Sequence, residues 1–468
     1  MSERILFLTG KLAEKSLHKV LAEMHPGEFG YDVLNIGISV AGLMTADLIS
    51  RRLPHPGNSS RILVPGRCRG DLDALSKHYG VPVARGPEEL KDLPQFFGKK
   101  GREQDLSRYD VQIFAEIVDA PQSSIEQILK RAERYRKDGA DVIDLGCLPE
   151  TPFPHLEDAV AALKKAGFAA SVDSVEPEEL LRGGKAGADY LLSLKEDTLW
   201  VADEVASIPV LIPERPGDLA SLERAMESMN KRRRRFIADS VLDPIHFGFT
   251  DSLARYHELR RRHPEIEIMM GVGNLTELTD ADTTGINALL MGVISELRIT
   301  HLLTTEVSPH ARRAVREADA ARRMLYAARE AGSLPRDFSS ALLTAHARKP
   351  FPDTPQEIAE LARAIKDPSY RIQVSEQGIH IFNRDGMHVA ADPFALFPLL
   401  DLQNDPAHAF YLGVELARAQ IAWQLGKRYN QDEELDWGCA VERKPQDLMQ
   451  HHAPGTTLQN RRKKTGNQ

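Results

Sequence analysis

The chain has 468 residues, of which 42% are hydrophobic and 27% are charged, and its formal net charge is −8. This length exceeds what one hydrophobic core normally supports, so we expect two or three domains. The negative charge argues against general nucleic-acid binding, which requires a basic surface. The three cysteines, Cys68, Cys147 and Cys439, have no metal-ligand or redox spacing and favour a reducing, cytoplasmic setting.

Neither end of the chain predicts a targeting or membrane segment. The amino-terminal run MSERILFLTG carries charges and lacks the pattern of a secretion signal. No stretch approaches the roughly 20 uninterrupted apolar residues that a membrane helix needs. We therefore expect a cytoplasmic protein without a membrane partner.

Residues 1–105 predict a small α/β domain of the Rossmann-like kind. Its apolar runs ILFLTG, DVLNIGI, RILVPG and VPVARG are typical of strands, and LAEKSLHKVLAEM has the period of an amphipathic helix. The polar segment near residues 95–110 predicts a linker to the next domain.

Residues 106–330 alternate between apolar runs and helical stretches of about 10–15 residues. The predicted strands are VQIFAEIV, DVIDLG, AASVDS, YLLSL, PVLIP, FIADSV, EIMMGVG and HLLTTE. Alternating strands and helices predict a parallel sheet, and eight strands fit a (β/α)8 TIM barrel. A doubly wound open sheet is the alternative.

Residues 331–440 predict an α+β domain. The helix EIAELARAI precedes two strands joined by the turn residues Asp385 and Gly386, and the long helix HAFYLGVELARAQIAWQLGKRY follows. Residues 441–468 are polar and predict a disordered tail. The tail histidines His451 and His452 have no partners at ligand spacing, and we predict no dedicated metal site from the sequence.

Several predicted barrel strands end in an acid or an amide that a turn follows. These polar residues are Asp144, Asp173, Asp239, Asp243 and Asn274. Side chains at the carboxyl ends of barrel strands point into the mouth of the barrel, where such folds place their chemistry. The pattern therefore predicts a pocket for a flat ring that forms hydrogen bonds.

The order of the motifs GADVIDLG, SVDS, DSVLDP and GVGN resembles the pterin-binding barrels, namely dihydropteroate synthase and the methyltetrahydrofolate-binding methyltransferases. The likeness covers most of residues 111–310. With RILVPGRCRGD and HAFYLGVELARAQ included, the whole chain is most similar to dihydropteroate-synthase-related proteins of methanogens and methylotrophs. Those proteins are associated with tetrahydromethanopterin biosynthesis, a branch of one-carbon metabolism.

The resemblance implies that two acids face the pterin ring. A carboxylate can accept two parallel, charge-assisted hydrogen bonds from the amino-pyrimidine edge of a pterin. Asp239 matches the Asp-Pro that ends strand six in the family, and Asp243 is its rival for this role. Asp173 matches the acid of the family's Ser-Ile-Asp-Thr or Ser-Ile-Asp-Ser element, with a helix N-cap as the alternative role.

Three further positions match the family less closely. Asn274 corresponds to the asparagine of the Gly-Leu-Ser-Asn motif in pterin-dependent methyltransferases, although a turn residue is the alternative. Asp144 and Gly146 match the Asp-Val-Gly of strand two, where a structural role for the acid is the alternative. Ser193 stands on strand four, where the family carries asparagine.

The half of the family pocket that handles pyrophosphate and aminobenzoate is rewritten. Glu116 replaces the asparagine that helps to hold pyrophosphate, and Glu306 replaces the basic Arg-x-His. The segment Pro149–Pro152 replaces Thr-Arg-Pro. Glu116 and Glu306 would instead suit a bound Mg2+ or a substrate with hydroxyls and amines.

The resemblance therefore implies a transferase that joins a dihydropterin methyl pyrophosphate to a ribosylated aminobenzene, with Asp173, Asp239 and Asn274 as the catalytic residues. One alternative is a methyltransferase that acts on a methylated pterin. A second alternative is a pterin-binding or carrier protein without catalysis. Barrels of this kind often pair, so a homodimer is a further expectation.

Overall fold

The computed structural model describes residues 3–24, 29–87, 90–97, 105–336, 338–402 and 405–442. Contacts divide the chain into two units, which are described separately. Unit 1 comprises Met1–Glu103, Ala345–Trp437 and Val441–Gln468, and unit 2 comprises Gln104–Thr344 and Gly438–Ala440. The domain boundaries near residues 105, 330 and 440 stay predictions. Residues 98–104 of the predicted linker and 443–468 of the predicted tail lie outside the described residues.

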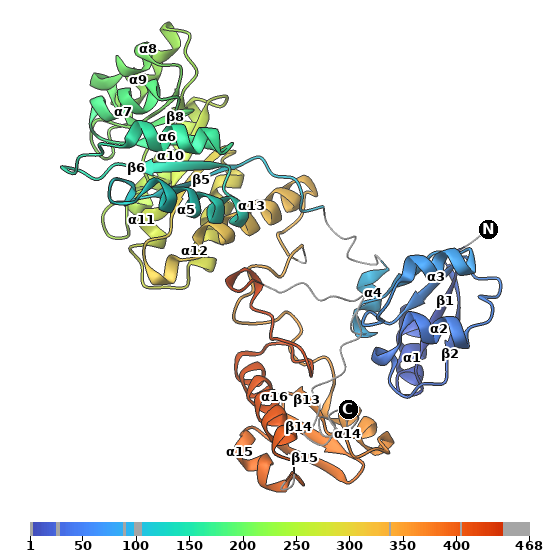
Figure 1. Cartoon of the computed structure of the whole chain (residues 1–468). Coiled ribbons are helices and arrows are strands. Elements are labelled where there is room, and N and C mark those ends of the chain that lie inside the picture. Colours follow the sequence, from blue (N-terminus) through green and yellow to red (C-terminus); the bar gives the residue numbers. More distant parts are fainter. Residues whose placement is uncertain are drawn as a thin grey trace, which may run out of the picture. The chain divides into compact units, whose positions relative to one another are not determined.

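Unit 2 is a closed barrel of parallel strands with helices between them (Figure 1). The strands are β5 (Gln112–Ile117), β6 (Val142–Gly146), β7 (Ala169–Asp173), β8 (Tyr190–Leu194), β9 (Ile208–Leu211), β10 (Ile237–Ala238), β11 (Glu267–Gly271) and β12 (His301–Thr305). Strand β12 pairs with β5 and closes the ring. The predicted TIM barrel is confirmed, and the open doubly wound sheet is wrong.

The main barrel helices are α5 (Ile125–Asp138), α6 (Leu156–Lys165), α7 (Pro177–Lys185), α9 (Leu219–Lys231), α10 (Phe249–Arg262), α12 (Thr283–Glu296) and α13 (Ala314–Glu330). Shorter turns of helix are α8 (Val201–Glu204) and α11 (Gly273–Thr276). Helix α5 shows how the local sequence fixes such an element. A capping box of Ser124 and Gln127 begins it, and Gly139 ends it in the left-handed conformation at φ 109°.

Strand alternation separates two apolar layers in the barrel. Phe114, Val142, Ile237 and Met269 face inward and fill the interior. The neighbouring residues of the same strands, such as Ile113 and Ile143, face outward and pack under the helices. Toward the carboxyl end, the next inward residue is Glu116 on β5 and Asp144 on β6, and on β7 it is Ser171, which Asp173 follows, so the interior changes from apolar to polar and charged at that end. We call this carboxyl end the barrel mouth.

The amino-terminal part of unit 1 is a four-stranded parallel sheet in the order β2-β1-β3-β4. Its strands are β1 (Glu3–Thr9), β2 (Phe29–Asn35), β3 (Arg61–Val64) and β4 (Val83–Arg85). Its helices are α1 (Glu14–Met24), α2 (Ala46–Arg52), α3 (Leu72–Tyr79) and α4 (Leu93–Phe96). Separate apolar clusters, one around Ile49 and Ile62 and one around Ile5 and Leu21, form its core.

The carboxyl-terminal part of unit 1 is a three-stranded antiparallel sheet, β13 (Arg371–Ser375), β14 (Gly378–Asn383) and β15 (Gly386–Ala390). Helix α16 (Pro406–Leu425) packs Leu412 and Leu416 against the sheet residues Ile379 and Ile381. Helices α14 (Pro355–Ala364) and α15 (Pro393–Leu396) complete this part. None of the helices within the described ranges has the length and apolar character needed to cross a membrane.

Candidate functional site

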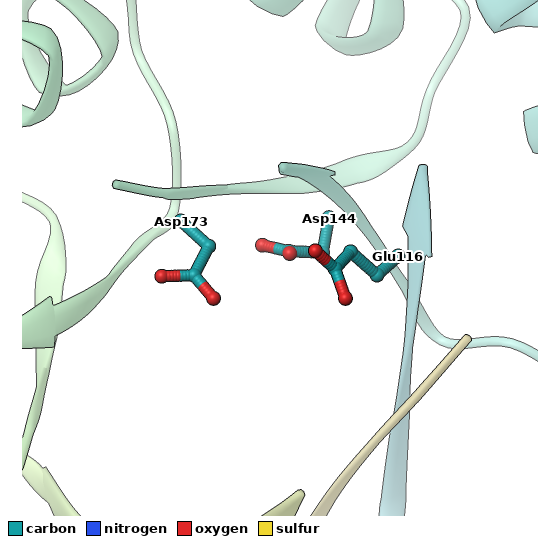
Figure 2. Close-up of side chains that lie close together, drawn as sticks. All are labelled: Glu116, Asp144 and Asp173. Carbon is teal, nitrogen blue, oxygen red and sulfur yellow. The ribbon is translucent and has the colours of Figure 1, made fainter. Parts of the chain in front are cut away.

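Three carboxylates from neighbouring strands converge at the barrel mouth (Figure 2). They belong to Glu116 on β5, Asp144 on β6 and Asp173 on β7, and we call them the acid cluster. One carboxylate oxygen from each residue lies within 4.8 Å of the others. Figure 2 shows Asp144 between the other two side chains. The sequence motifs predicted Asp144 and Asp173 at strand ends, and the fold brings both of them to Glu116.

Strand register brings the acid cluster together. Glu116 is directly opposite Asp144 in the parallel pairing of β5 and β6, so both side chains leave the same face of the sheet. Asp173 is opposite Gly146 in the pairing of β6 and β7. A Cβ atom at Gly146 would lie 2.6 Å from Oε1 of Glu116, so the absence of a side chain there makes room for the glutamate.

Asp144 is the most deeply buried member of the acid cluster, with a relative exposure of 0%. The Ser171 hydroxyl donates a hydrogen bond to its Oδ1 atom. Its Oδ2 atom is buried and accepts no hydrogen bond from any described residue. Buried carboxylate oxygens are normally paired, so this oxygen is an exception among the described residues.

Burial raises the pKa values of all three acids. The pKa of Asp144 lies well above its usual range because of burial and the nearby charges of Asp173 and Glu116. Burial, with Asp173 and Glu277, raises the pKa of Glu116 to about 8. Burial also raises the pKa of Asp173, against the effect of a hydrogen bond from Ser193. Among the described residues, no lysine, arginine or histidine forms an ion pair with these acids, so the cluster lacks a compensating positive charge.

Ser193 contacts the acid cluster and has an unusual backbone conformation. Its φ angle is 71°, and the register between β8 and β9 shifts at this point. Its hydroxyl donates a 2.6 Å hydrogen bond to Oδ1 of Asp173. A left-handed conformation is costly for a residue other than glycine, and such strain concentrates at functional sites. Ser193 therefore orients Asp173.

Asp239 is a fourth acid of the mouth and directly follows β10. Its relative exposure is 8%, and it accepts hydrogen bonds from the Tyr256 hydroxyl and, at 2.7 Å, from the Val241 backbone N–H. Burial raises its pKa to about 6, although the two hydrogen bonds oppose the shift and Asp173 adds to it. Val241 has a φ of 66°, a strained value for a β-branched residue.

Asp243, the rival of Asp239, already has an ion-pair partner within the chain. Its Oδ2 atom lies 2.6 Å from a guanidinium nitrogen of Arg255, and the two side chains are only 13% and 14% exposed. The same guanidinium group donates to the Val241 carbonyl at 3.0 Å. No ion pair among the described residues involves Asp239, so it is the more available acceptor for a ligand.

Asn274 connects two loops of the mouth and does not join the acid cluster. It lies on α11, is exposed, and donates a 2.7 Å hydrogen bond from Nδ2 to the Leu242 carbonyl. Leu242 lies in the loop that carries Asp239. The amide therefore holds that loop beside the end of β11, and its assignment as a ligand-binding or catalytic residue stays a prediction.

Glu306 is placed in the helix layer. It follows β12, whose inward positions are His301, Leu303 and Thr305, so the alternation turns it outward. Its side chain is 1% exposed, pairs with Arg134 of α5 and accepts a 3.2 Å hydrogen bond from the Val315 N–H. The expected cooperation of Glu116 and Glu306 around Mg2+ is therefore wrong, and Asp144 and Asp173 are the acids beside Glu116.

Sequence reasoning missed Tyr256, Ser171 and Glu277. Ser171 opens the SVDS motif but was given no role, Tyr256 lies in no motif, and only their hydrogen bonds to acids reveal what they do. Burial alone would raise the pKa of Glu277, but donors from Val307, Ser308 and Thr305 outweigh it and hold the pKa below its usual range. Glu277 therefore adds a negative charge near Glu116.

Comparison with known sequences gives two matches. A family of unknown function, DUF6513, matches residues 3–88, which lie in unit 1. An uncharacterized protein of Methanocaldococcus jannaschii is 27% identical, and the alignment covers 92% of this chain and 99% of that protein. The alignment therefore includes residues of both units.

Comparison with solved structures gives matches to dihydropteroate synthases. The Yersinia pestis synthase in a sulfonamide drug complex is 18% identical, with a TM-score of 0.39, and covers 50% of this chain and 98% of that chain. The Coxiella burnetii synthase in complex with pteroic acid is 15% identical, with a TM-score of 0.39, and covers 47% of this chain and 94% of that chain. Each synthase is thus matched over almost its full length.

Proposed function

We propose that the barrel mouth binds a dihydropterin and that the protein is a dihydropteroate-synthase-like transferase of tetrahydromethanopterin biosynthesis. The observation that carries this proposal is the inward placement of two acids, the half-buried Asp173 at the end of β7 and the buried Asp239 directly after β10, where the motif resemblance puts the ring. The methanogen source of the 27% identical relative also supports the pathway.

The charge state of the mouth supports a ligand rich in N–H donors. Burial raises the pKa values of both Asp173 and Asp239 because it destabilises their charged forms, and an N–H donor that approaches either carboxylate stabilises that form. The amino-pyrimidine edge of a pterin presents adjacent N–H groups, which suit a carboxylate acceptor. Asp239 would hold that edge, and Asp173, oriented by Ser193, would face the ring.

The proposed reaction forms a C–N bond at the pterin methylene carbon. The amine nitrogen of the aryl substrate attacks this carbon, the C–O bond to pyrophosphate breaks, and the electron pair leaves with the pyrophosphate. The amine proton passes to a carboxylate of the mouth or to water. The developing charge on the leaving group needs stabilisation, which Mg2+ bound to the pyrophosphate can supply. The acids of the mouth suit an acceptor whose ribose hydroxyls donate hydrogen bonds.

The test is a coupling assay with the full-length chain. The protein is incubated with 6-hydroxymethyl-7,8-dihydropterin pyrophosphate, a ribosylated aminobenzene and Mg2+, and product and pyrophosphate are measured. Wild type should form the coupled product, and Asp239→Asn should lose both product formation and ring binding. Asp243→Asn tests the rival acid in parallel. If wild type forms no product and also shows no saturable ring binding, the proposal is refuted.

A pterin-binding protein without catalysis is the second candidate. It is favoured by Glu116 and Glu306, acids at positions where the family resemblance places an asparagine and basic residues. This candidate predicts saturable binding of the dihydropterin with no pyrophosphate release. The methyltransferase alternative depends on Asn274, whose amide donates to the Leu242 carbonyl.

A further inference from the structure

We propose that Glu116, Asp144 and Asp173 form a binding site for one divalent metal ion of the oxygen-preferring class, such as Mg2+ or Mn2+. The three carboxylates come from three adjacent strands of a closed barrel, so the scaffold and not a mobile loop sets their positions. Carboxylate oxygens are the ligands that these ions prefer. The sequence did not predict this set, because no spacing along the chain identifies it.

The Oδ2 atom of Asp144 is an observation independent of the clustering that points to a ligand at this position. Asp144 is fully buried, and this oxygen has no hydrogen-bond donor among the described residues. The other oxygen accepts from Ser171, which fixes the orientation of the carboxylate. This oxygen is oriented, desolvated and unpaired, and it lies between two other carboxylates. These are features of a metal ligand.

The dimensions of the acid cluster suit one ion after a small contraction. The candidate ligand oxygens lie within 4.8 Å of one another. Oxygens bound to Mg2+ at about 2.1 Å lie about 3.0 Å apart when adjacent and about 4.2 Å apart when opposite in an octahedron. An ion between the three carboxylates would draw their oxygens together. Water would complete the coordination shell.

The net negative charge of the acid cluster favours a bound cation over a neutral ligand that only donates hydrogen bonds. No ion pair formed by the described residues includes Glu116, Asp144 or Asp173, and Glu277 adds negative charge beside Glu116. A divalent ion would compensate two of the three charges of the acid cluster. Protons shared among the carboxylates are the competing explanation, and they predict no metal affinity.

This inference does not depend on the identity of the organic ligand. Each of the three metal ligands is a protein side chain, so the ion should bind in the absence of any pterin. Metal binding and ring binding are therefore measured separately, and the failure of one leaves the other intact. Asp239 lies outside the acid cluster and provides a matched control, because it is also a buried acid of the mouth.

The experiment titrates the full-length chain with Mn2+ and follows free Mn2+ by electron paramagnetic resonance. Wild type should bind one Mn2+ in competition with Mg2+. Asp144→Asn keeps the acceptor for Ser171 and removes the charge, and it should weaken Mn2+ binding by about 10-fold or more. Asp239→Asn should keep the wild-type stoichiometry and stay within about threefold of the wild-type affinity.

Thermal unfolding distinguishes a loss of metal binding from a loss of the folded structure in the variant. Without metal, Asp144→Asn should unfold at a temperature no lower than wild type, because it relieves repulsion among buried carboxylates. Saturating Mn2+ should raise the melting temperature of wild type but not of this variant. A stable, folded Asp144→Asn protein that binds Mn2+ as wild type does, or a wild type that binds none, would overturn the inference.

Discussion

The Glu116 carboxylate occupies the space that a side chain on Gly146 would fill. A Cβ atom at residue 146 would lie 2.6 Å from Oε1 of Glu116, closer than real contacts allow. Gly146 is the last residue of β6 and Glu116 lies near the end of β5. The space beside Gly146 at the mouth therefore holds the Glu116 side chain. The position of one acid thus depends on the smallest residue of the neighbouring strand.

Gly146→Ala should therefore displace Glu116 and disrupt the acid cluster. The added methyl group also meets the Val118 Cα at 3.1 Å and the Ile117 carbonyl at 3.3 Å, so we expect a loss of about 1–3 kcal/mol in unfolding free energy. Denaturant unfolding and Mn2+ titration measure the two effects. Gly271→Ala is the control, because Gly271 also ends a barrel strand and has open space around its Cβ position. Equal behaviour of the two variants would refute this account of Gly146.

Ring binding should weaken as the pH falls through about 6. Burial raises the pKa of Asp239 to about 6, and only its ionised form accepts two N–H bonds from a pterin edge. The groups around this carboxylate are Tyr256, Arg255, Asp173 and the Val241 N–H. Tyr256→Phe removes a donor that lowers the pKa, so the midpoint of the affinity profile should move to higher pH. Dihydropterin titrations between pH 5 and 8, in metal-free buffer, measure this shift, and coincident wild-type and variant profiles would exclude this role for Asp239.

His301 should make folding less favourable in acid. Burial lowers its pKa to about 4, although the nearby Glu267 carboxylate opposes the shift. An unfolded histidine has a pKa of about 6.5, so the unfolded chain takes up the proton first as the pH falls. The contribution of neutral His301 is complete above about pH 6.5 and is lost as the pH falls toward 4, with a total on the order of 3 kcal/mol. As the pH falls through this range, the unfolding free energy of wild type should decrease relative to that of His301→Gln, and parallel pH profiles would contradict the prediction.

Ser193 should show opposing effects of hydrogen bonding and backbone strain. Alanine at this position loses the hydrogen bond to Asp173 but keeps the φ of 71°, whereas glycine loses the bond and relieves the strain. A left-handed residue other than glycine costs roughly 1–2 kcal/mol. Ser193→Gly should therefore be more stable than Ser193→Ala by about 1 kcal/mol in denaturant unfolding. If Ser193→Ala is the more stable variant, the assigned strain is wrong.

The barrel was predictable because its strands are short apolar runs that alternate with amphipathic helices. The same pattern located Asp144 and Asp173, since each is the inward residue at the end of a run. Glu306 shows the limit of this reasoning. It lies one residue beyond the end of β12, and this one step in the period of two turns it into the helix layer, where Arg134 pairs with it.

The partners of the acids were less predictable than the acids themselves. Tyr256 lies on a helix with an ordinary apolar pattern, and its contact with Asp239 joins residues that are 17 positions apart. The strand register that sets Glu116 beside Asp144, and Gly146 beside Asp173, is a property of the closed barrel. Such contacts arise from tertiary packing, which local sequence patterns do not encode.

A crystal structure of the full-length chain with 6-hydroxymethyl-7,8-dihydropterin tests the central claim most directly. The account predicts the ring at the barrel mouth, with its amino-pyrimidine edge on the Asp239 carboxylate and Asp173 facing the ring. A ring bound elsewhere, or a mouth that stays empty at saturating ligand, would contradict it.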